Sequence, residues 1–123
     1  MVKDNTNQYY TDLLKHLQTK YTSLQGGQVY KATPLSFPYM YFKQIEGSGA
    51  LLTLSNTEKG INFGCEIKFY SNKSASEVRN IANAARGYMV SNGFRCTYFS
   101  PVENISDSSI QQFIARFTKL DTD

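Results

Sequence analysis

The stretch FGCEIKFYSNKSASEV, residues 63–78, joins the end of a strand to the start of a helix without a glycine-rich turn. Its first half alternates apolar and polar residues, which is the pattern of a strand with one face on a core. Ser74 and Glu77 then match a capping box, in which the hydroxyl and the carboxylate satisfy backbone N–H groups at a helix start. The stretch therefore predicts a strand over about 61–71 that runs directly into a helix.

The helix that follows has an apolar stripe at helical spacing, formed by Val78, Ile81, Ala82, Ala85 and Met89. Asn92-Gly93 is a typical helix end. Two alanines in the stripe allow close approach of the helix backbone, so we expect this helix to pack flat on a sheet.

An earlier amphipathic segment carries apolar residues at the same spacing: Tyr10, Leu13, Leu14, Leu17, Tyr21 and Leu24. Gly26-Gly27 follows as the expected stop. At 3.6 residues per turn, this pattern predicts an N-terminal helix of about five turns.

Residues 37–46, 50–55 and 61–71 read as three strands separated by short turns at residues 47–49 and 56–60, where Gly and Asn tolerate tight reversals. Turns this short predict an antiparallel meander. The first strand is apolar on both faces, with Tyr39 and Tyr41 on one side and Met40 and Phe42 on the other. We therefore expect something to cover each side of it, and another subunit is one candidate.

The C-terminal part predicts two strands, at about 94–100 and 110–119. Ile110, Phe113, Ile114 and Phe117 also fit a helical period, but we favour a strand because β-branched and aromatic residues dominate. The expected fold is a single α+β domain over residues 1–123. Its sheet is mainly antiparallel, a three-stranded meander plus a terminal hairpin, with an N-terminal helix and a second helix packed on the sheet.

Composition excludes several classes of protein. The chain has 123 residues and a formal charge of +3, with its basic residues scattered, so it lacks the basic stripe of dedicated duplex binders. No segment approaches the roughly 20 apolar residues of a membrane span, and the N-terminus has no signal-peptide core. We expect no membrane contact and a cytoplasmic site of synthesis.

Chemistry-bearing residues are few. One histidine, His16, and two cysteines, Cys65 and Cys96, cannot supply a four-ligand zinc site. Both cysteines fall on strands, where we favour reduced thiols over a disulfide. No nucleophile elbow, paired carboxylates or phosphate-binding loop is present. We expect no catalytic, cofactor-binding or metal-binding residues, with a pocket around His16 as the enzymatic alternative.

Single-stranded nucleic acid could stack on Tyr39 and Tyr41 with Lys43 alongside, as strand aromatics do in several binding modules. We favour core or subunit contacts for these tyrosines.

Three segments together resemble the small tail-terminator and tail-completion proteins of long-tailed bacteriophages, especially those that infect Gram-positive bacteria. They are FPYMYF at 37–42, CEIKFYSNKSASEVRNIA at 65–82 and GFRCTYFSPVENISDSSIQQFIARF at 93–117. The resemblance spans residues 10 to 120 and rests on the order of features, not on a signature motif.

The resemblance implies a structural virion protein of the tail or neck, assembled in the host bacterial cytoplasm. Its partners would be itself in a closed ring, usually a hexamer, the major tail tube protein and the head connector or stopper protein. DNA would pass through the lumen without sequence recognition. The ring would cap the tube, stop its polymerisation and join tail to head. A head-to-tail connector or other neck ring is the alternative, and outside virions a small nucleic-acid-binding α+β module.

Two candidate surfaces follow. The first is a subunit or tube interface formed by Phe37, Tyr39, Tyr41, Gly49 and Lys59. The second is a lumen or DNA-facing pair, Arg79 and Arg86, for which an ordinary exposed helix face is the simpler interpretation.

Overall fold

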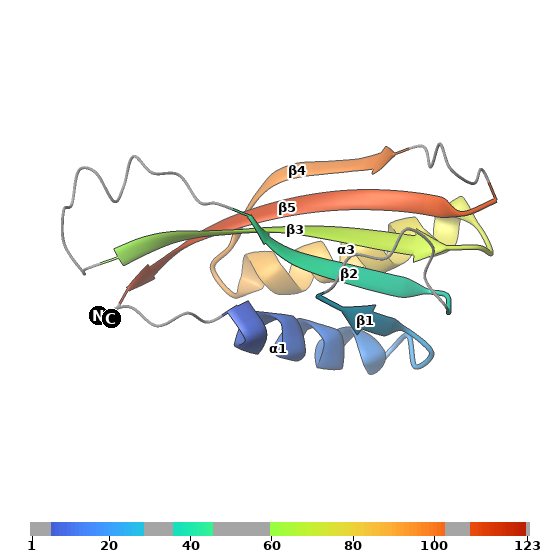
Figure 1. Cartoon of the computed structure of the whole chain (residues 1–123), viewed down its shortest axis with the longest axis horizontal. Coiled ribbons are helices and arrows are strands. Elements are labelled where there is room, and N and C mark those ends of the chain that lie inside the picture. The colour runs from blue at the N-terminus through green and yellow to red at the C-terminus, as the bar shows by residue number, and fades with distance from the viewer. Residues whose placement is uncertain (1–5, 29–35, 46–59, 103–108, 123) are drawn as a thin grey trace.

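The computed structural model describes residues 6–28, 36–45, 60–102 and 109–122 (Figure 1). Its elements, in chain order, are α1 (Thr6–Gln18), β1 (Gln25–Gly27), β2 (Tyr39–Ile45), β3 (Gly60–Ser71), α3 (Ala75–Ser91), β4 (Arg95–Val102) and β5 (Gln111–Thr122). The predicted strand at 50–55 lies outside the described residues.

The strands form one sheet in the order β1-β2-β3-β5-β4. Pairs β2–β3, β3–β5 and β5–β4 are antiparallel, whereas β1 pairs with β2 in parallel. The α+β class and the mostly antiparallel sheet are thus as predicted, and β4 and β5 pair as the terminal hairpin. The sheet is not strictly a meander plus a hairpin, because β1 adds a parallel strand beside β2. The last strand lies between β3 and β4, because it buries Phe113, Ala115 and Phe117 and gains a partner on each edge. The largely exposed β4 takes the edge.

The preference for a C-terminal strand is confirmed. Along β5 the fully buried residues recur with a period of two, and Arg116 between them is exposed. Ile110 and Ile114, which fitted a helical period, fall on the opposite face of the sheet from Phe113.

The N-terminal helix is shorter than predicted. It ends at Gln18, whose side-chain Nε2 donates to the Leu24 carbonyl at 2.8 Å and holds the turn that follows. Gly26-Gly27 does not stop the helix but forms β1. The glycines allow close approach: a Cβ at Gly27 would lie 2.3 Å from the Tyr39 hydroxyl oxygen, and one at Gly26 would crowd Leu14 at 3.2 Å.

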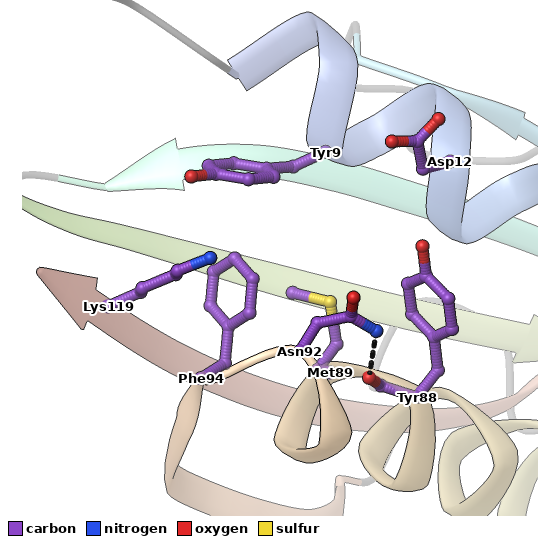
Figure 2. Close-up of a pocket in the computed structure, with 7 residues that line it drawn as sticks. All are labelled: Tyr9, Asp12, Tyr88, Met89, Asn92, Phe94 and Lys119. Carbon is purple, nitrogen blue, oxygen red and sulfur yellow. Dashed lines mark hydrogen bonds between the residues drawn. The ribbon is translucent and has the colours of Figure 1, made fainter. Parts of the chain in front are cut away.

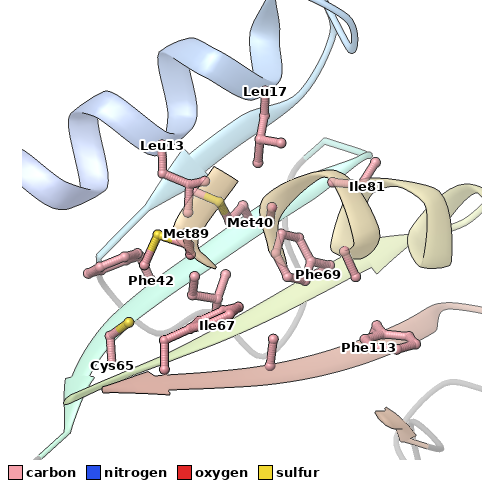
Figure 3. Close-up of a cluster of buried hydrophobic side chains, with 14 of the residues drawn as sticks. Leu13, Leu17, Met40, Phe42, Cys65, Ile67, Phe69, Ile81, Met89 and Phe113 are labelled. Atoms are coloured by element: carbon pink, nitrogen blue, oxygen red, sulfur yellow. The ribbon is translucent and has the colours of Figure 1, made fainter. Parts of the chain in front are cut away.

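In the described part of the chain, both helices lie on one face of the sheet (Figure 1). Every residue of the predicted α3 stripe is buried there. Figure 3 shows two of them, Ile81 and Met89, in one cluster with Leu13 and Leu17 from α1 and with inward residues of β2, β3 and β5.

The opposite face of the sheet carries a second, smaller cluster. Tyr39, Tyr41, Tyr70 and Ile110 are between 4% and 8% exposed, and Phe37 packs against them. The two apolar faces of β2 are therefore both buried within this chain.

The junction between β3 and α3 is built around Ser71, which is fully buried. Its hydroxyl donates to the Glu77 carboxylate and accepts from the Lys73 backbone N–H at 3.0 Å. Ser74 caps the helix by accepting from the Glu77 N–H at 3.0 Å. The predicted cap is confirmed at Ser74, but the Glu77 carboxylate bonds the strand residue Ser71 in place of the Ser74 backbone.

Candidate interaction surfaces

Within the described residues, no helix is long and apolar enough to cross a bilayer. No cluster of three or more His, Cys, Asp or Glu side chains is present in that same part of the chain. Both cysteines are free, Cys65 buried and Cys96 half-buried. Burial raises the pKa of the Cys65 thiol to about 12, partly offset by a hydrogen bond from the Phe117 backbone. Cys65 is therefore a core residue and not a thiolate nucleophile.

A small cavity of about 80 Å³ lies between α1, the end of α3 and the end of β5 (Figure 2). It is lined by Tyr9, Asp12, Tyr88, Met89, Asn92, Phe94 and Lys119. This lining contains a carboxylate and an ammonium but neither a histidine nor a serine or cysteine nucleophile.

Most polar groups around this cavity have structural partners. Asp12 accepts two hydrogen bonds from Gln8, each at 2.9 Å, and Asn92 donates to the Tyr88 carbonyl at 2.8 Å. The Lys119 ammonium lies 5.4 Å from the centre of the Tyr9 ring and 5.1 Å from that of Phe94. Burial, and next the nearby Asp12 charge, raise the pKa of Tyr88. These side chains therefore cover the end of the main core near Met89 and Phe94.

His16 lies outside that lining. Its side chain is exposed, as predicted, and its ring stacks on Tyr88 with centroids 4.5 Å apart. The Thr19 hydroxyl donates to the backbone carbonyl of His16 at 2.6 Å and not to its ring. The described contacts of His16 therefore do not form the geometry of a triad.

The predicted interface residues are placed as follows. Phe37, Tyr39 and Tyr41 come together in the second cluster, where Tyr39 and Tyr41 are 7% and 8% exposed. Burial raises the pKa of Tyr39, with Tyr41 as a smaller cause. Gly49 and Lys59 lie outside the described residues. Little of the tyrosine surface remains for stacking against nucleic acid or for direct contact with a neighbouring subunit.

Arg79 and Arg86 are both exposed on α3. Their guanidinium groups lie 5.8 Å and 5.0 Å from the ring centres of Phe113 and Phe99. Those rings contact each other edge-on at 4.6 Å. The two arginines thus cover the joint between the helix and the β5–β4 pair, next to Val90, which is 49% exposed.

Sequence reasoning missed a third surface. The strand register places Lys43, Lys68, Arg95, Arg116 and Glu66 on the sheet face opposite the helices. We call these five side chains the basic sheet face. Alternation within β3 is enough to place Lys68 and Glu66 on the same face of the sheet. Only the order of the strands shows that Lys43, Arg95 and Arg116 lie beside them.

No known protein-family profile and no curated protein sequence matches the chain. Among solved structures, the fold is similar to a chain of the virion of a native gene transfer agent (GTA) particle. The TM-score is 0.57 with 14% sequence identity, over 94% of this chain and 92% of the other. The likeness therefore concerns the fold and extends over nearly the whole of both chains.

Proposed function

We propose that this chain is a structural virion protein, a ring subunit that caps a phage tail tube, stops its polymerisation and joins the tail to the head connector. The observation that carries the proposal is the fold likeness to a chain of a GTA virion over nearly the full length of both proteins. The three segments that resemble tail terminators all contribute to that fold.

The described surface supports a role in shape instead of chemistry. The buried Ser71 hydroxyl is bonded to Glu77 and to the Lys73 backbone at the β3–α3 junction, and the lining of the small cavity contains no serine, cysteine or histidine. We infer that the protein is not an enzyme and uses no cofactor. In a closed ring, each subunit would contact two neighbours through different patches, and closure limits growth.

A hexamer is the proposed ring, with the major tail tube protein on one side and the head connector or stopper protein on the other. The alternative within virions is another neck ring, since the fold likeness is to a virion particle and names no position within it.

Tube polymerisation tests the proposal. Purified tube protein is allowed to polymerise while light scattering is recorded, and the chain is added at a small molar fraction. A terminator should halt growth at a fraction set by the number of tube ends, whereas a connector that does not bind the tube should leave the scattering curve unchanged. Growth that continues at stoichiometric amounts of the chain contradicts the proposal.

A further inference from the structure

The basic sheet face gathers charge from four strands. Lys43 pairs opposite Glu66, Glu66 opposite Arg116, and Arg95 opposite Thr118, so all of these side chains share one face. Lys68 is two residues along β3 from Glu66 and points the same way. With strands about 4.8 Å apart and same-face residues about 6.8 Å apart, the four cations fit in a patch roughly 14 Å on a side.

The five side chains of the patch carry four formal positive charges and one negative charge. Glu66 is the carboxylate within it, and its side chain is 13% exposed and bound to Arg116 Nε at 2.8 Å. Lys43 and Arg95 are exposed and make no ion pair in the described part of the chain. The side chain of Arg116 is 46% exposed, so the patch is open to a large partner.

The composition of the patch favours a phosphate backbone over a protein. Protein interfaces have an apolar, often aromatic centre with charges at the rim. Here the centre is charged, and the exposed aromatic beside it is Tyr98, whose ring lies 5.1 Å from the Arg116 guanidinium. Lys and Arg side chains are the groups that contact DNA phosphates.

Single-stranded nucleic acid is less suited to this surface. Single strands stack their bases on accessible aromatic rings. On this face Tyr39, Tyr41 and Tyr70 are at most 8% exposed and pack on each other. Apart from Tyr98 at its border, the accessible groups of the patch are mainly cations, which suit the outside of a duplex.

We propose that the basic sheet face binds the phosphate backbone of double-stranded DNA without reading its sequence. The inference deepens the proposed function and rests on it for the identity of the polymer, because a tail channel conducts duplex DNA. It assigns DNA contact to the sheet and not to Arg79 and Arg86 on the helical side.

Fluorescence anisotropy of a labelled 20-base-pair duplex, titrated with the full chain at several NaCl concentrations, tests the assignment. With three to four phosphates neutralised, the slope of log K against log salt should be about −3. The double variant Lys43→Gln, Arg95→Gln should flatten the slope by about 2 and weaken binding at least about tenfold at low salt.

The matched control is Arg79→Gln, Arg86→Gln, which removes two exposed cations from the other side of the molecule. This variant should bind within about twofold of the unchanged protein. Weakening by the control and not by the sheet variant overturns the assignment, and so does an absence of duplex binding at 50 mM salt. Tighter binding to a single strand of the same length also overturns it.

The result separates this inference from the proposed function. If the unchanged protein halts tube growth but does not bind duplex, the inference alone fails. If it binds duplex through this face and does not halt tube growth, the terminator role fails. The result would then support the alternative function, a small nucleic-acid-binding module. The sheet variant should still halt tube growth, because the exposed Lys43 and Arg95 belong to neither core cluster.

Discussion

Ser71 shows how a single polar residue sets the direction of α3. Its buried hydroxyl bonds the Glu77 side chain on the helix and the Lys73 and Ser74 backbone N–H groups in the loop. These bonds tie the last residue of β3 to the first turn of α3, so the helix leaves the strand in one direction. Buried polar groups linked in this way are costly to break.

Ser71→Ala should lower the free energy of unfolding by about 1–3 kcal/mol, because it leaves the Glu77 carboxylate and two backbone donors without their partner. Ser76→Ala is the matched control, since Ser76 is exposed in the first turns of α3. Its effect should be near zero or slightly stabilising. Urea unfolding followed by circular dichroism measures both, and equal stabilities would refute the role given to Ser71.

The two cysteines differ enough in burial to be told apart by a thiol reagent. At pH 8, Cys96 should react within minutes and Cys65 only when the protein unfolds, because the Cys65 thiol is fully buried with a pKa of about 12. Cys96→Ser should abolish the fast reaction. Two fast thiols in the folded protein would contradict the buried placement of Cys65.

The same thiol gives a pH dependence of known sign. Its pKa is raised in the folded state from 9.0 to about 12, so the unfolded chain loses the proton first as the pH rises. The stabilisation is fully present below pH 9 and is lost between about pH 9 and 12. Across this window, the denaturant midpoint of Cys65→Ala should fall less steeply with rising pH than the midpoint of the unchanged protein.

At the scale of elements, β1 depends on two positions without side chains. Gly26 faces Leu14 and Tyr10 from α1, and Gly27 faces the Tyr39 hydroxyl on the other side of the sheet. An added Cβ would only crowd the Leu14 side chain at Gly26, but at Gly27 it would overlap the Tyr39 hydroxyl.

Gly27→Ala should therefore destabilise the protein by about 1–3 kcal/mol, the usual cost of overpacking. Gly87→Ala is the control with the opposite sign. Gly87 lies exposed in α3 with nothing within 4 Å of an added Cβ, so alanine should stabilise the helix by about 0.5–1 kcal/mol. Thermal unfolding of the two variants decides, and a neutral Gly27→Ala would contradict the packing of β1.

The sequence predicts those elements whose determinants are local. The Ser74 cap, the α3 stripe and the Asn92-Gly93 end all lie within one segment, and all three are found. The position of β5 between β3 and β4 depends on which strands bury its aromatic residues, a long-range property that no local pattern contains. For the same reason the glycines of β1 read as a helix stop.

At the scale of the whole molecule, the sheet has two unlike faces. One carries α1, α3 and the main core, and the other divides into the tyrosine cluster and the basic sheet face. In sequence Lys43, Arg95 and Arg116 are 25, 27 and 48 residues from Lys68, so the cations of this second face read as scattered until the strand order is known. The tyrosines read as excess surface because their neighbours Tyr70 and Ile110 come from distant segments.

Substitution of a buried tyrosine in this cluster is therefore expected to lower the stability of the fold. Truncating a buried aromatic side chain costs about 3–5 kcal/mol. Tyr41→Ser should lower stability by an amount in this range while Tyr98→Ser, at the exposed position, should not. Chemical denaturation compares them, and equal stabilities would return Tyr41 to the set of free interface residues.

We propose that the chain works by forming a closed ring on the end of a tube. Negative-stain electron microscopy of tail tubes incubated with the purified chain tests it most directly. We expect tubes of limited length, each ended by a symmetric ring that is absent without the chain. Tubes with bare, growing ends beside unbound monomers would contradict it.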